Sequence, residues 1–509
     1  MRPFYITTPI YYVNDKPHIG HAYTSLAADV LARWKRMQGF DVFFLTGTDE
    51  HGQKVEKAAQ DAGEAPQVFV DRVSQTFRDL ALAMGFSNDG FIRTTEPRHY
   101  AACQALWTRL LEAGAIYEGH YEGWYAVRDE AYYGPDELVE RDGQKFAPSG
   151  APVEWVREPS WFFRLSAWGD RLLAHFEANP DFIAPPSRRN EVIAFIKSGL
   201  QDLSISRTSF SWGVPVPNDP AHVMYVWLDA LTNYLTAVGY PDENAPDYRY
   251  WPADIHFVGK DILRFHAIYW PAFLMAADLP LPKRVFAHGW WTNEGQKISK
   301  SLGNVIDPLA LIEDYGLDPV RYFLLREVSF GQDGDFSRRA LGGRLNSDLA
   351  NDLGNLAQRS LSLIQRNAEG KLPVLVPLTE ADHLLLDPVA ALPERVAEAI
   401  DRQAFHEALE RVWEVVRLGN SWIDAQKPWS LKKTDPVRGE AVLRHLHTAL
   451  RGLATVLLPF MPGSMGMMLD QCGVPETARG LADLTTPLPN GTPLAPPTPI
   501  FRKVELTAA

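Results

Sequence analysis

The sequence predicts an α/β protein in which a parallel β-sheet, interrupted by an inserted domain, is followed by a bundle of helices. Three observations lead to this fold class. Segments typical of strands and helices alternate near the N-terminus, and a stretch rich in Tyr, Trp and Gly follows them. After about residue 340 the apolar residues recur only at helical spacing.

The N-terminal alternation begins with residues 4–10, whose β-branched and aromatic side chains predict a buried strand. Apolar residues then recur at intervals of three and four over residues 20–37, which predicts a helix, and Gly39 is placed to end it. A second strand is expected at residues 42–45. Because strand, helix and strand in succession form a βαβ unit, this region is expected to be a Rossmann-like sheet.

The rest of the chain changes character at about residues 115 and 215, and strands are expected to return at 223–227, 255–258 and 285–288. Helical stripes of apolar residues then follow: Leu349, Leu353 and Leu356; Phe405, Leu409, Val412 and Val416; Val442, Leu446, Leu450 and Leu453. The predicted domains are 1–114 and 216–290 as two halves of the sheet domain, 115–215 as the connective insertion, 291–345 as a loop and linker region, and 346–509 as an α-helical domain with a tail.

The composition is that of a soluble globular protein, since 46% of the 509 residues are hydrophobic and 22% are charged. The two cysteines, Cys103 and Cys472, are far apart, which argues against a disulfide framework and fits a reducing cytoplasm. No signal peptide or membrane-spanning run is recognisable, so no membrane partner is expected. A net charge of −13 argues against a protein that binds nucleic acid without sequence preference, because such a protein carries a strong positive field. Local basic patches would still allow this chain to bind a folded RNA.

The first candidate site is the tetrapeptide His-Ile-Gly-His at residues 18–21, placed where a strand turns into a helix. The helix N-terminus offers N–H groups and a partial positive charge to phosphate, and Gly20 lets the backbone come close. The two imidazoles, three residues apart, would face the same phosphate chain. Two ordinary histidines near a turn would look the same, so the motif alone leaves both interpretations open.

The second candidate site is Lys-Ile-Ser-Lys-Ser at residues 297–301, with Gly295 before it and Gly303 after it. Its lysines and hydroxyls suit the negative charge that develops on a polyphosphate, and flanking glycines let the loop hinge. A solvated loop without a ligand is the alternative. The order of the two segments resembles the class I aminoacyl-tRNA synthetases, whose signatures are HIGH and KMSKS; here the second signature has Ile298 in place of Met.

Three further segments, residues 8–14, 225–234 and 259–266, are similar to the methionyl family of these synthetases, and the similarity covers most of the chain. The resemblance implies a methionine pocket lined by Pro9, Ile10, Tyr12, Asp49, Trp227, Ala230, Leu231, Tyr234, Ile262 and His266. In it a carboxylate would hold the ammonium group, and aromatic rings would contact the polarisable thioether. Any one of the aromatic residues, taken alone, would more often be an ordinary core residue.

The resemblance also implies an ATP site that works with Mg²⁺ and is formed by His18, Gly20, His21, Gly259, Asp261, His288, Lys297, Ser299 and Lys300. Of these, His18, His21, Lys297 and Lys300 are the implied catalytic residues, acting on the phosphates. Arg207 maps onto a further arginine of the family's catalytic domain.

Many methionyl enzymes carry a zinc knuckle with Cys-x-x-Cys pairs in the insertion, but residues 124–130 and 150–153 contain no cysteine. A four-thiolate site cannot form without these ligands. The sequence therefore resembles the zinc-free subgroup, and no bound metal other than the Mg²⁺ of Mg-ATP is expected.

In the helical region Asn355 and Arg359 are four residues apart on one helix face, and Trp429 lies in a separate segment. By resemblance these three residues read the anticodon, where a tryptophan stacks on a base and polar groups bond base edges. A helix-packing tryptophan and a solvated basic face are the alternatives.

The resemblance as a whole implies a monomeric, cytoplasmic methionine–tRNA ligase that uses ATP, L-methionine and both initiator and elongator tRNA(Met). Another class I synthetase is one alternative; the short insertion and the lack of zinc-ligating cysteines argue against the editing and cysteinyl enzymes. A nucleotidyltransferase-like enzyme without a tRNA partner, or a synthetase-like binding protein, is a second alternative. The helical region and the lysine loop argue against these two.

Overall fold

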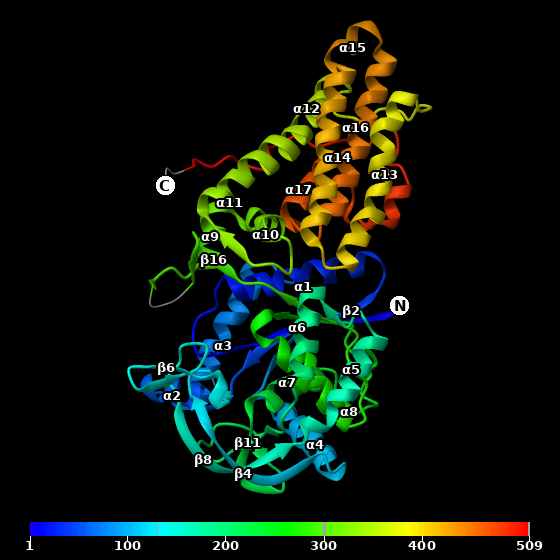
Figure 1. Ribbon diagram of the computed structural model, residues 1–509. Helices are drawn as coiled ribbons and strands as arrows, with labels where there is room; N and C mark the ends of the chain where they lie inside the picture. The colour runs from blue at the N-terminus through cyan, green and yellow to red at the C-terminus, as the bar shows by residue number, and fades with distance from the viewer. Residues whose placement is uncertain (130, 299–301, 507–509) are drawn as a thin grey trace. The chain divides into compact units, whose positions relative to one another are not determined.

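The computed structural model describes residues 1–129, 131–298 and 302–506, and the chain divides into two compact units (Figure 1). The first unit comprises Met1–Pro17 and Asp41–His288, and the second comprises His18–Phe40 and Gly289–Ala509. The helix that follows the first strand therefore belongs, by its contacts, with the C-terminal part of the chain.

A six-stranded parallel sheet forms the centre of the first unit, in the order β3-β2-β1-β14-β15-β9. Its strands are β1 (Pro3–Tyr12), β2 (Asp41–Asp49), β3 (Gly90–Arg93), β9 (Ile183–Ala184), β14 (Ile255–Gly259) and β15 (Val285–His288). From β1 the chain builds outward through β2 to β3, and the later strands join on the other side of β1. In such sheets ligands bind at the carboxyl ends of the strands, where the strand order reverses, which here is between β1 and β14.

The sheet confirms the predicted fold class and the strands expected at 4–10, 42–45, 255–258 and 285–288. The strand expected at 223–227 is partly wrong, because β13 (Asp219–Met224) ends and helix α7 (Val226–Thr236) begins inside that range. Nearly every residue of α7 is buried. A short apolar run that is buried on all sides has no period that distinguishes a strand from a helix.

The helices of the first unit pack with the sheet around one large core, to which Tyr5, Trp107, Leu231 and Phe273 contribute. Besides α7 they include α2 (Gln53–Asp61), α3 (Pro66–Ala83), α4 (Pro97–Glu112), α5 (Gly169–Ala178), α6 (Pro186–Lys197), α8 (Trp270–Ala276) and the short helices η4 (Lys260–Ile262) and η5 (Phe265–Tyr269). The helices α7 and α4 contact each other and place polar residues inside this core.

The region predicted as an insertion is mainly antiparallel. One sheet has the order β10-β8-β4-β5, a second has the order β11-β13-β12, and β6 pairs with β7. Their bounds are β4 (Ile116–Ala126), β5 (Ala131–Tyr133), β6 (Val139–Arg141), β7 (Gln144–Phe146), β8 (Glu154–Phe163), β10 (Leu203–Ser204), β11 (Ser206–Arg207) and β12 (Pro215–Val216). From the same region β9 joins the parallel sheet beside β15.

The second unit contains α1 (Ile19–Met37) and a small sheet in the order β17-β16-β18, with β16 (Trp291–Asn293), β17 (Gln296–Lys297) and β18 (Gly334–Phe336). The helix expected at 20–37 is thereby confirmed, and Gly39 follows its last turn with a φ of 85°, a conformation that glycine adopts without strain.

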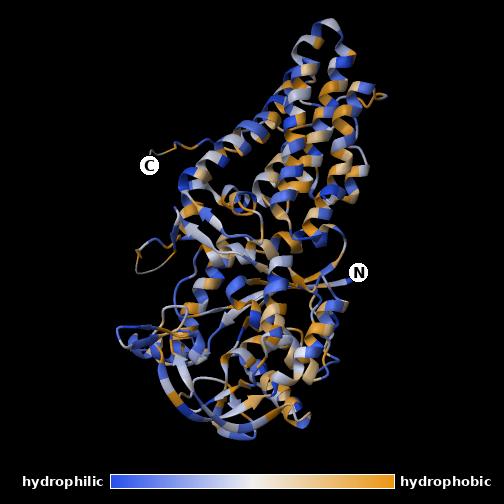
Figure 2. Cartoon of the chain, viewed as in Figure 1, coloured by the Kyte–Doolittle hydropathy of each residue, from blue (hydrophilic) through white to orange (hydrophobic). Residues whose placement is uncertain are grey.

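A bundle of helices makes up most of the second unit, and α13, α14 and α16 run side by side in Figure 1. The helices are α9 (Pro308–Tyr315), α10 (Leu317–Arg326), α11 (Arg338–Arg344), η7 (Leu345–Gly354), α12 (Asn355–Asn367), α13 (Glu380–Asp401), α14 (Phe405–Gln426), α15 (Pro428–Thr434), α16 (Pro436–Leu457) and α17 (Pro462–Gln471). The residues of the three predicted apolar stripes are all buried, and Figure 2 shows hydrophobic and hydrophilic residues alternating along these helices.

Among the residues that the structure describes, no helix combines the length and the apolar character needed to cross a membrane.

Candidate active site

Strands β1 and β14 lie next to each other where the strand order reverses, and both carry predicted site residues at their carboxyl ends. On β1, Pro9 is buried, whereas Ile10 and Tyr12 are partly exposed. Pro9 lies where the register between β1 and β2 shifts, as expected of a residue that has no N–H to donate to the ladder. On β14, Gly259 is the last residue of the strand. These residues therefore lie at the edge of the sheet where this fold binds ligands.

Asp49 is the last residue of β2 and lies beside Tyr12, its register partner on β1. The Asp49 side chain is only 6% exposed. The segment that follows β1 is held to the end of β2, because the Val13 N–H donates to the Asp49 carbonyl oxygen over 3.2 Å. A buried carboxylate at the carboxyl edge of the sheet suits a cationic group on a ligand.

Helix α7 presents four predicted pocket residues on one face. The first is Trp227, and the others follow it by three, four and seven residues: Ala230, Leu231 and Tyr234. In a helix this spacing places all four on one side. Trp227 is partly exposed and the other three are buried. The indole of Trp227 stacks on Phe265 with ring centroids 3.6 Å apart and an interplanar angle of 9°.

A chain of hydrogen bonds joins this face to η4 and η5. The Nδ1 atom of His266 donates to the carbonyl oxygen of Ile262 over 2.9 Å, because a carbonyl oxygen can only accept. In the neutral ring Nε2 is then the acceptor, so the Tyr234 hydroxyl donates to it over 2.8 Å. Burial lowers the pKa of His266 to about 4, which keeps the ring neutral near pH 7. The ring therefore contributes shape and a fixed dipole rather than a charge.

Gly259 and His288 are register partners at the carboxyl ends of β14 and β15. Asp261 follows Gly259 by two residues and is exposed. A Cβ atom on residue 259 would lie 2.6 Å from an oxygen of the Asp261 side chain, so a larger residue there would displace this carboxylate. Three of the residues predicted to bind ATP thus lie together at one edge of the sheet.

Arg207 lies on β11 and is 2% exposed, with its guanidinium between aromatic rings. The guanidinium carbon is 4.5 Å from the ring centre of Tyr132 and 4.4 Å from that of Tyr225. The Nη1 atom donates to the hydroxyl of Ser204 and to the carbonyl of Ser206, while Nε and Nη2 have no hydrogen-bond partner among the described residues. Nε nevertheless lies 3.9 Å from a carboxylate oxygen of Glu158, an ion pair, so Nη2 is the donor that suits a further polar group.

In the second unit, His18 and His21 lie at the N-terminus of α1. His18 is the N-cap: its Nδ1 accepts from the Gly20 N–H over 3.0 Å, and the His21 Nδ1 accepts from the His18 N–H over 3.0 Å. The two ring centres are 4.0 Å apart. Because each Nδ1 accepts, the neutral rings carry their protons on Nε2. Both imidazoles are therefore set as N–H donors beside a helix N-terminus, which favours an anion.

The second signature lies in the same unit, and part of it is described. Lys297 is exposed at the end of β17, and its carbonyl oxygen accepts from the Asn304 side chain over 3.1 Å. The N–H of Ile19, the first residue of α1, donates to the carbonyl oxygen of Ile306 over 3.2 Å. The first signature is thus hydrogen-bonded directly to the segment that follows the second signature. Ser299 and Lys300 lie outside the described residues.

The predicted anticodon residues lie in the helical bundle. The guanidinium carbon of Arg359 on α12 is 5.8 Å from the ring centre of Trp429 on α15, and Arg359 Nη2 pairs with Asp424 over 2.5 Å. Trp429 is 48% exposed, so about half of its surface is accessible to a ligand. Asn355 is exposed one helical turn before Arg359. The structure therefore brings Arg359 and Trp429 together, with Asn355 on the same helix.

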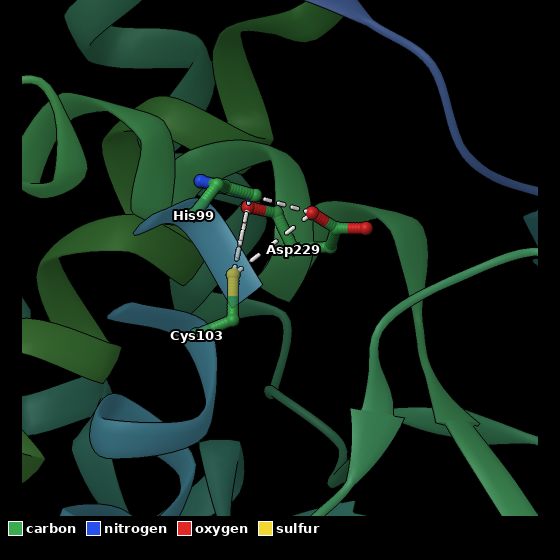
Figure 3. A group of neighbouring side chains, drawn as sticks. All are labelled: His99, Cys103 and Asp229. Carbon is green, nitrogen blue, oxygen red and sulfur yellow. Dashed lines mark hydrogen bonds and ion pairs between the residues drawn. The ribbon is translucent and has the colours of Figure 1, made fainter. Parts of the chain in front are cut away.

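One polar cluster beside the pocket was missed by the sequence analysis. Figure 3 shows His99 and Cys103 of α4 next to Asp229 of α7, and His51 contacts the same carboxylate. The signal that would have found Asp229 is an acidic residue inside an apolar helical run, since a buried charge needs partners. Phe265 was also missed, although it lies next to His266.

Comparison with known proteins places the chain in a family. Residues 4–361 match the family model described as tRNA synthetases class I (M), and residues 373–508 match the anticodon binding domain of methionyl tRNA ligase. The chain is 57% identical to the methionine–tRNA ligase of Rickettsia conorii over 99% of both chains, and 55% identical to that of Brucella suis over 98% of this chain and 97% of the other.

Solved structures give the same result. A Mycobacterium tuberculosis methionyl-tRNA synthetase in complex with methionyl-adenylate has a TM-score of 0.97 at 51% identity, covering 98% of this chain and 100% of that one. The apo form of the Mycobacterium tuberculosis enzyme has a TM-score of 0.91 at 48% identity, covering 99% of both chains. The parallel sheet and its two signatures define a class I aminoacyl-tRNA synthetase. Within that class, the chain belongs to the methionine–tRNA ligase family, as the sequence predicted.

Proposed function

We propose that the protein activates L-methionine with ATP to form methionyl-adenylate and pyrophosphate, and then transfers the methionyl group to the 3′ end of tRNA(Met). The observation that carries this proposal is the face of α7 that ends in the Tyr234–His266 hydrogen bond, on a helix that packs against β1 and β14 of the parallel sheet. An apolar, aromatic surface with one neutral polar pair suits an unbranched thioether side chain.

The methionine pocket that we propose comprises Pro9, Ile10, Tyr12, Asp49, Trp227, Ala230, Leu231, Tyr234, Ile262 and His266. Asp49 holds the ammonium group of the substrate by a charge-assisted hydrogen bond. Trp227, fixed by its stack on Phe265, and Tyr12 contact the apolar side chain. The Tyr234–His266 pair closes the pocket without adding a charge.

The ATP site that we propose comprises His18, Gly20, His21, Gly259, Asp261, His288, Lys297, Ser299 and Lys300. The Nε2–H groups of His18 and His21 donate to the phosphates, and Lys297 and Lys300 neutralise the pyrophosphate. Asp261 contacts the ribose, and Arg207 supports the same catalytic domain through its ion pair with Glu158 and its remaining donor Nη2. Mg²⁺ accompanies ATP and offsets the charge of its phosphates.

The reaction needs no nucleophile from the protein. A carboxylate oxygen of methionine attacks the α-phosphorus of ATP, the bond to the bridging oxygen breaks, and pyrophosphate leaves. A terminal hydroxyl of the tRNA then attacks the carbonyl carbon, and AMP leaves. The protein therefore accelerates both steps by holding the reactants in line and by stabilising the charge on the phosphates.

The second substrate, tRNA(Met) in its initiator and elongator forms, is recognised in this proposal by Asn355, Arg359 and Trp429. Residues 1–114 and 216–290 form the catalytic domain, 115–215 the connective insertion, 291–345 the lysine loop and linker, and 346–509 the anticodon-binding domain. We place the enzyme in the cytoplasm as a monomer.

No structural zinc is required in this proposal. In the insertion, Ala126, Ala147 and Ala151 form a small buried cluster, and alanine has no side-chain ligand for a metal. The Asp129 carboxylate accepts hydrogen bonds from Tyr133 and Ser149 beside it. These contacts support the proposal that packing and hydrogen bonds hold this part of the insertion.

Charging of purified tRNA(Met) with radiolabelled methionine tests the complete function. We expect charging of initiator and elongator tRNA(Met) and none of a non-cognate tRNA such as tRNA(Val). Methionine activation without charging would favour a nucleotidyltransferase-like enzyme, and the absence of both would favour a synthetase-like binding protein.

A further inference from the structure

The carboxylate of Asp229 is fully buried inside an apolar helix and is shared by two histidines. His51 Nδ1 lies 2.6 Å from Oδ2, and His99 Nε2 lies 2.7 Å from Oδ1. An ionised carboxylate only accepts hydrogen bonds, so both imidazoles donate to it. Burial raises the pKa of Asp229, but the two histidines outweigh this effect and lower it to about 2. The side chain is therefore ionised under all ordinary conditions.

The outer nitrogens of the two rings also have partners. His51 Nε2 is 2.9 Å from the Tyr100 hydroxyl, and His99 Nδ1 is 2.9 Å from the Thr236 hydroxyl. Every polar atom of the two rings and of the carboxylate thus takes part in one network. Buried networks in which each member is satisfied hold their elements in a single arrangement.

An alternative to this hydrogen-bonded network is a metal site formed by His99, Cys103 and Asp229, because their ligand atoms all lie within 4.8 Å of one another. The ligands of a tetrahedral zinc ion, at ~2.0–2.3 Å from the metal, lie roughly 3.3–3.8 Å apart. Here the Asp229 oxygen and the His99 nitrogen are 2.7 Å apart, which is a hydrogen bond. This distance therefore favours the hydrogen-bonded network, part of which the dashed lines of Figure 3 mark.

The network joins the two parts of the proposed methionine site. His51 follows Asp49 by two residues, and the loop between them is held by Trp212, which donates to the Glu50 carbonyl over 2.6 Å and accepts from the Gly52 N–H over 3.0 Å. Asp229 lies on α7 between two of the residues proposed to line the pocket. A displaced His51 would carry the adjoining loop with it.

We propose that Asp229 is a positioning residue for methionine activation, which holds the loop of Asp49 against helix α7 through His51, while His99 fixes the carboxylate from the other side. Asp229 does not touch the substrate. It sets the separation between the group that binds the ammonium and the surface that binds the side chain. This inference rests on the proposed function, because it acts through the proposed role of Asp49.

The Asp229→Asn variant tests this inference. The amide keeps the shape but places an N–H₂ group against one of the two donating imidazoles. We expect the KM for methionine in ATP–pyrophosphate exchange to rise roughly 10-fold to 100-fold, with the KM for ATP unchanged. Asp382→Asn is the matched control, since Asp382 is an equally buried carboxylate in the helical bundle, and its KM for methionine should equal that of the wild type.

Conservative variants separate positioning from a general effect on folding. Asn at position 51 keeps a donor near the place of Nδ1, and Gln at position 99 keeps one near the place of Nε2. His51→Asn and His99→Gln should therefore retain most of the methionine affinity that His51→Ala and His99→Ala lose. These four variants also test the proposal if Asp229→Asn fails to fold.

A double variant shows whether the effect passes through Asp49. If it does, Asp49→Asn with Asp229→Asn binds methionine no more weakly than Asp49→Asn alone. Fully additive losses, or an unchanged KM in Asp229→Asn, would overturn the proposal, as would one zinc ion per chain that is lost in Cys103→Ala. A wild-type enzyme without methionine-dependent exchange would instead overturn the proposed function and this inference together.

Discussion

The carboxylate of Asp29 on α1 and the guanidinium of Arg321 on α10 form an ion pair of 2.7 Å in which neither side chain is exposed. Arg321 also donates to the carbonyl oxygens of Pro459 and Phe460, each over 2.9 Å. Asp29 accepts a second bond from Arg33 on its own helix. Through this pair the helix that begins at the first signature is bound to the C-terminal helices, although the two residues are 292 positions apart.

Replacement of Arg321 by Met should lower the free energy of unfolding by ~3–5 kcal/mol, because it removes the buried ion-pair partner of Asp29, which keeps only Arg33, and the donor to the Pro459 and Phe460 carbonyls. Urea unfolding followed by circular dichroism measures this change. The matched control is Arg338→Met, which breaks an exposed pair with Asp314 and should change the free energy by no more than ~1 kcal/mol. Equal effects of the two variants would contradict the structural role of the buried pair.

His447 provides a test of pH dependence outside the active site. Burial lowers its pKa from 6.5 to about 4, against the opposing effect of its hydrogen bond to the Cys472 carbonyl. Because the unfolded chain takes up the proton first, the stabilisation is complete above pH 6.5 and is lost as the pH falls toward 4. The carboxyl groups of Asp229 and Asp382, whose pKa values are lowered to about 2, titrate below this window.

The His447→Gln variant keeps a donor for the Cys472 carbonyl but cannot be protonated. Between pH 6.5 and 4 its stability should fall less steeply than that of the wild type, by up to ~1.4 kcal/mol per pH unit. Urea unfolding at several pH values gives the two slopes. Identical slopes would show that His447 is not held neutral by burial.

Removal of the Tyr234 hydroxyl tests the hydrogen bond that closes the proposed pocket. Tyr234→Phe leaves the buried His266 Nε2 without its donor, so the KM for methionine should rise roughly 5-fold to 50-fold while the KM for ATP stays the same. Tyr248→Phe is the control, because the Tyr248 hydroxyl has no hydrogen-bond partner among the described residues. A similar rise in both variants would argue against a specific role for the pair.

The exposed indole of Trp429 is expected to act only when tRNA is bound. Trp429→Ala should leave ATP–pyrophosphate exchange unchanged and should lower the kcat/KM for tRNA(Met) charging by roughly 10-fold to 100-fold, the loss of one stacked base. Leu384→Ala, which shortens another exposed apolar side chain of the helical bundle, should affect neither assay. Parallel losses of exchange and charging would remove Trp429 from the anticodon site.

The limits of prediction from sequence differ between the fold and the site. The strands β1, β2, β14 and β15 could be predicted because each is a short run of β-branched and aromatic residues. Helix α7 could not, because burial on all sides removes the period by which a helix is recognised. The tail of the helical domain was predicted, but the hydrogen bonds that its carbonyls at Leu488 and Thr486 accept from the buried Arg444 and Arg451 were not.

For the site, local patterns indicated only the two segments that we propose to bind phosphate. The pocket residues on α7 and η5 came from resemblance, since an aromatic residue in a core looks the same as one beside a substrate. The network around Asp229 could not be predicted, because its histidines lie 178 and 130 positions away. Only the folded sheet and helices bring them to one carboxylate.

Amino-acid-dependent ATP–pyrophosphate exchange, run with each of the twenty amino acids and no tRNA, tests the central claim most directly. We predict exchange with methionine and none above background with the other nineteen, because the face of α7 and the Tyr234–His266 pair fit a long apolar side chain. Exchange with a different amino acid would keep the class I chemistry and contradict the proposed pocket. The absence of exchange with any amino acid would contradict the proposed activation of methionine.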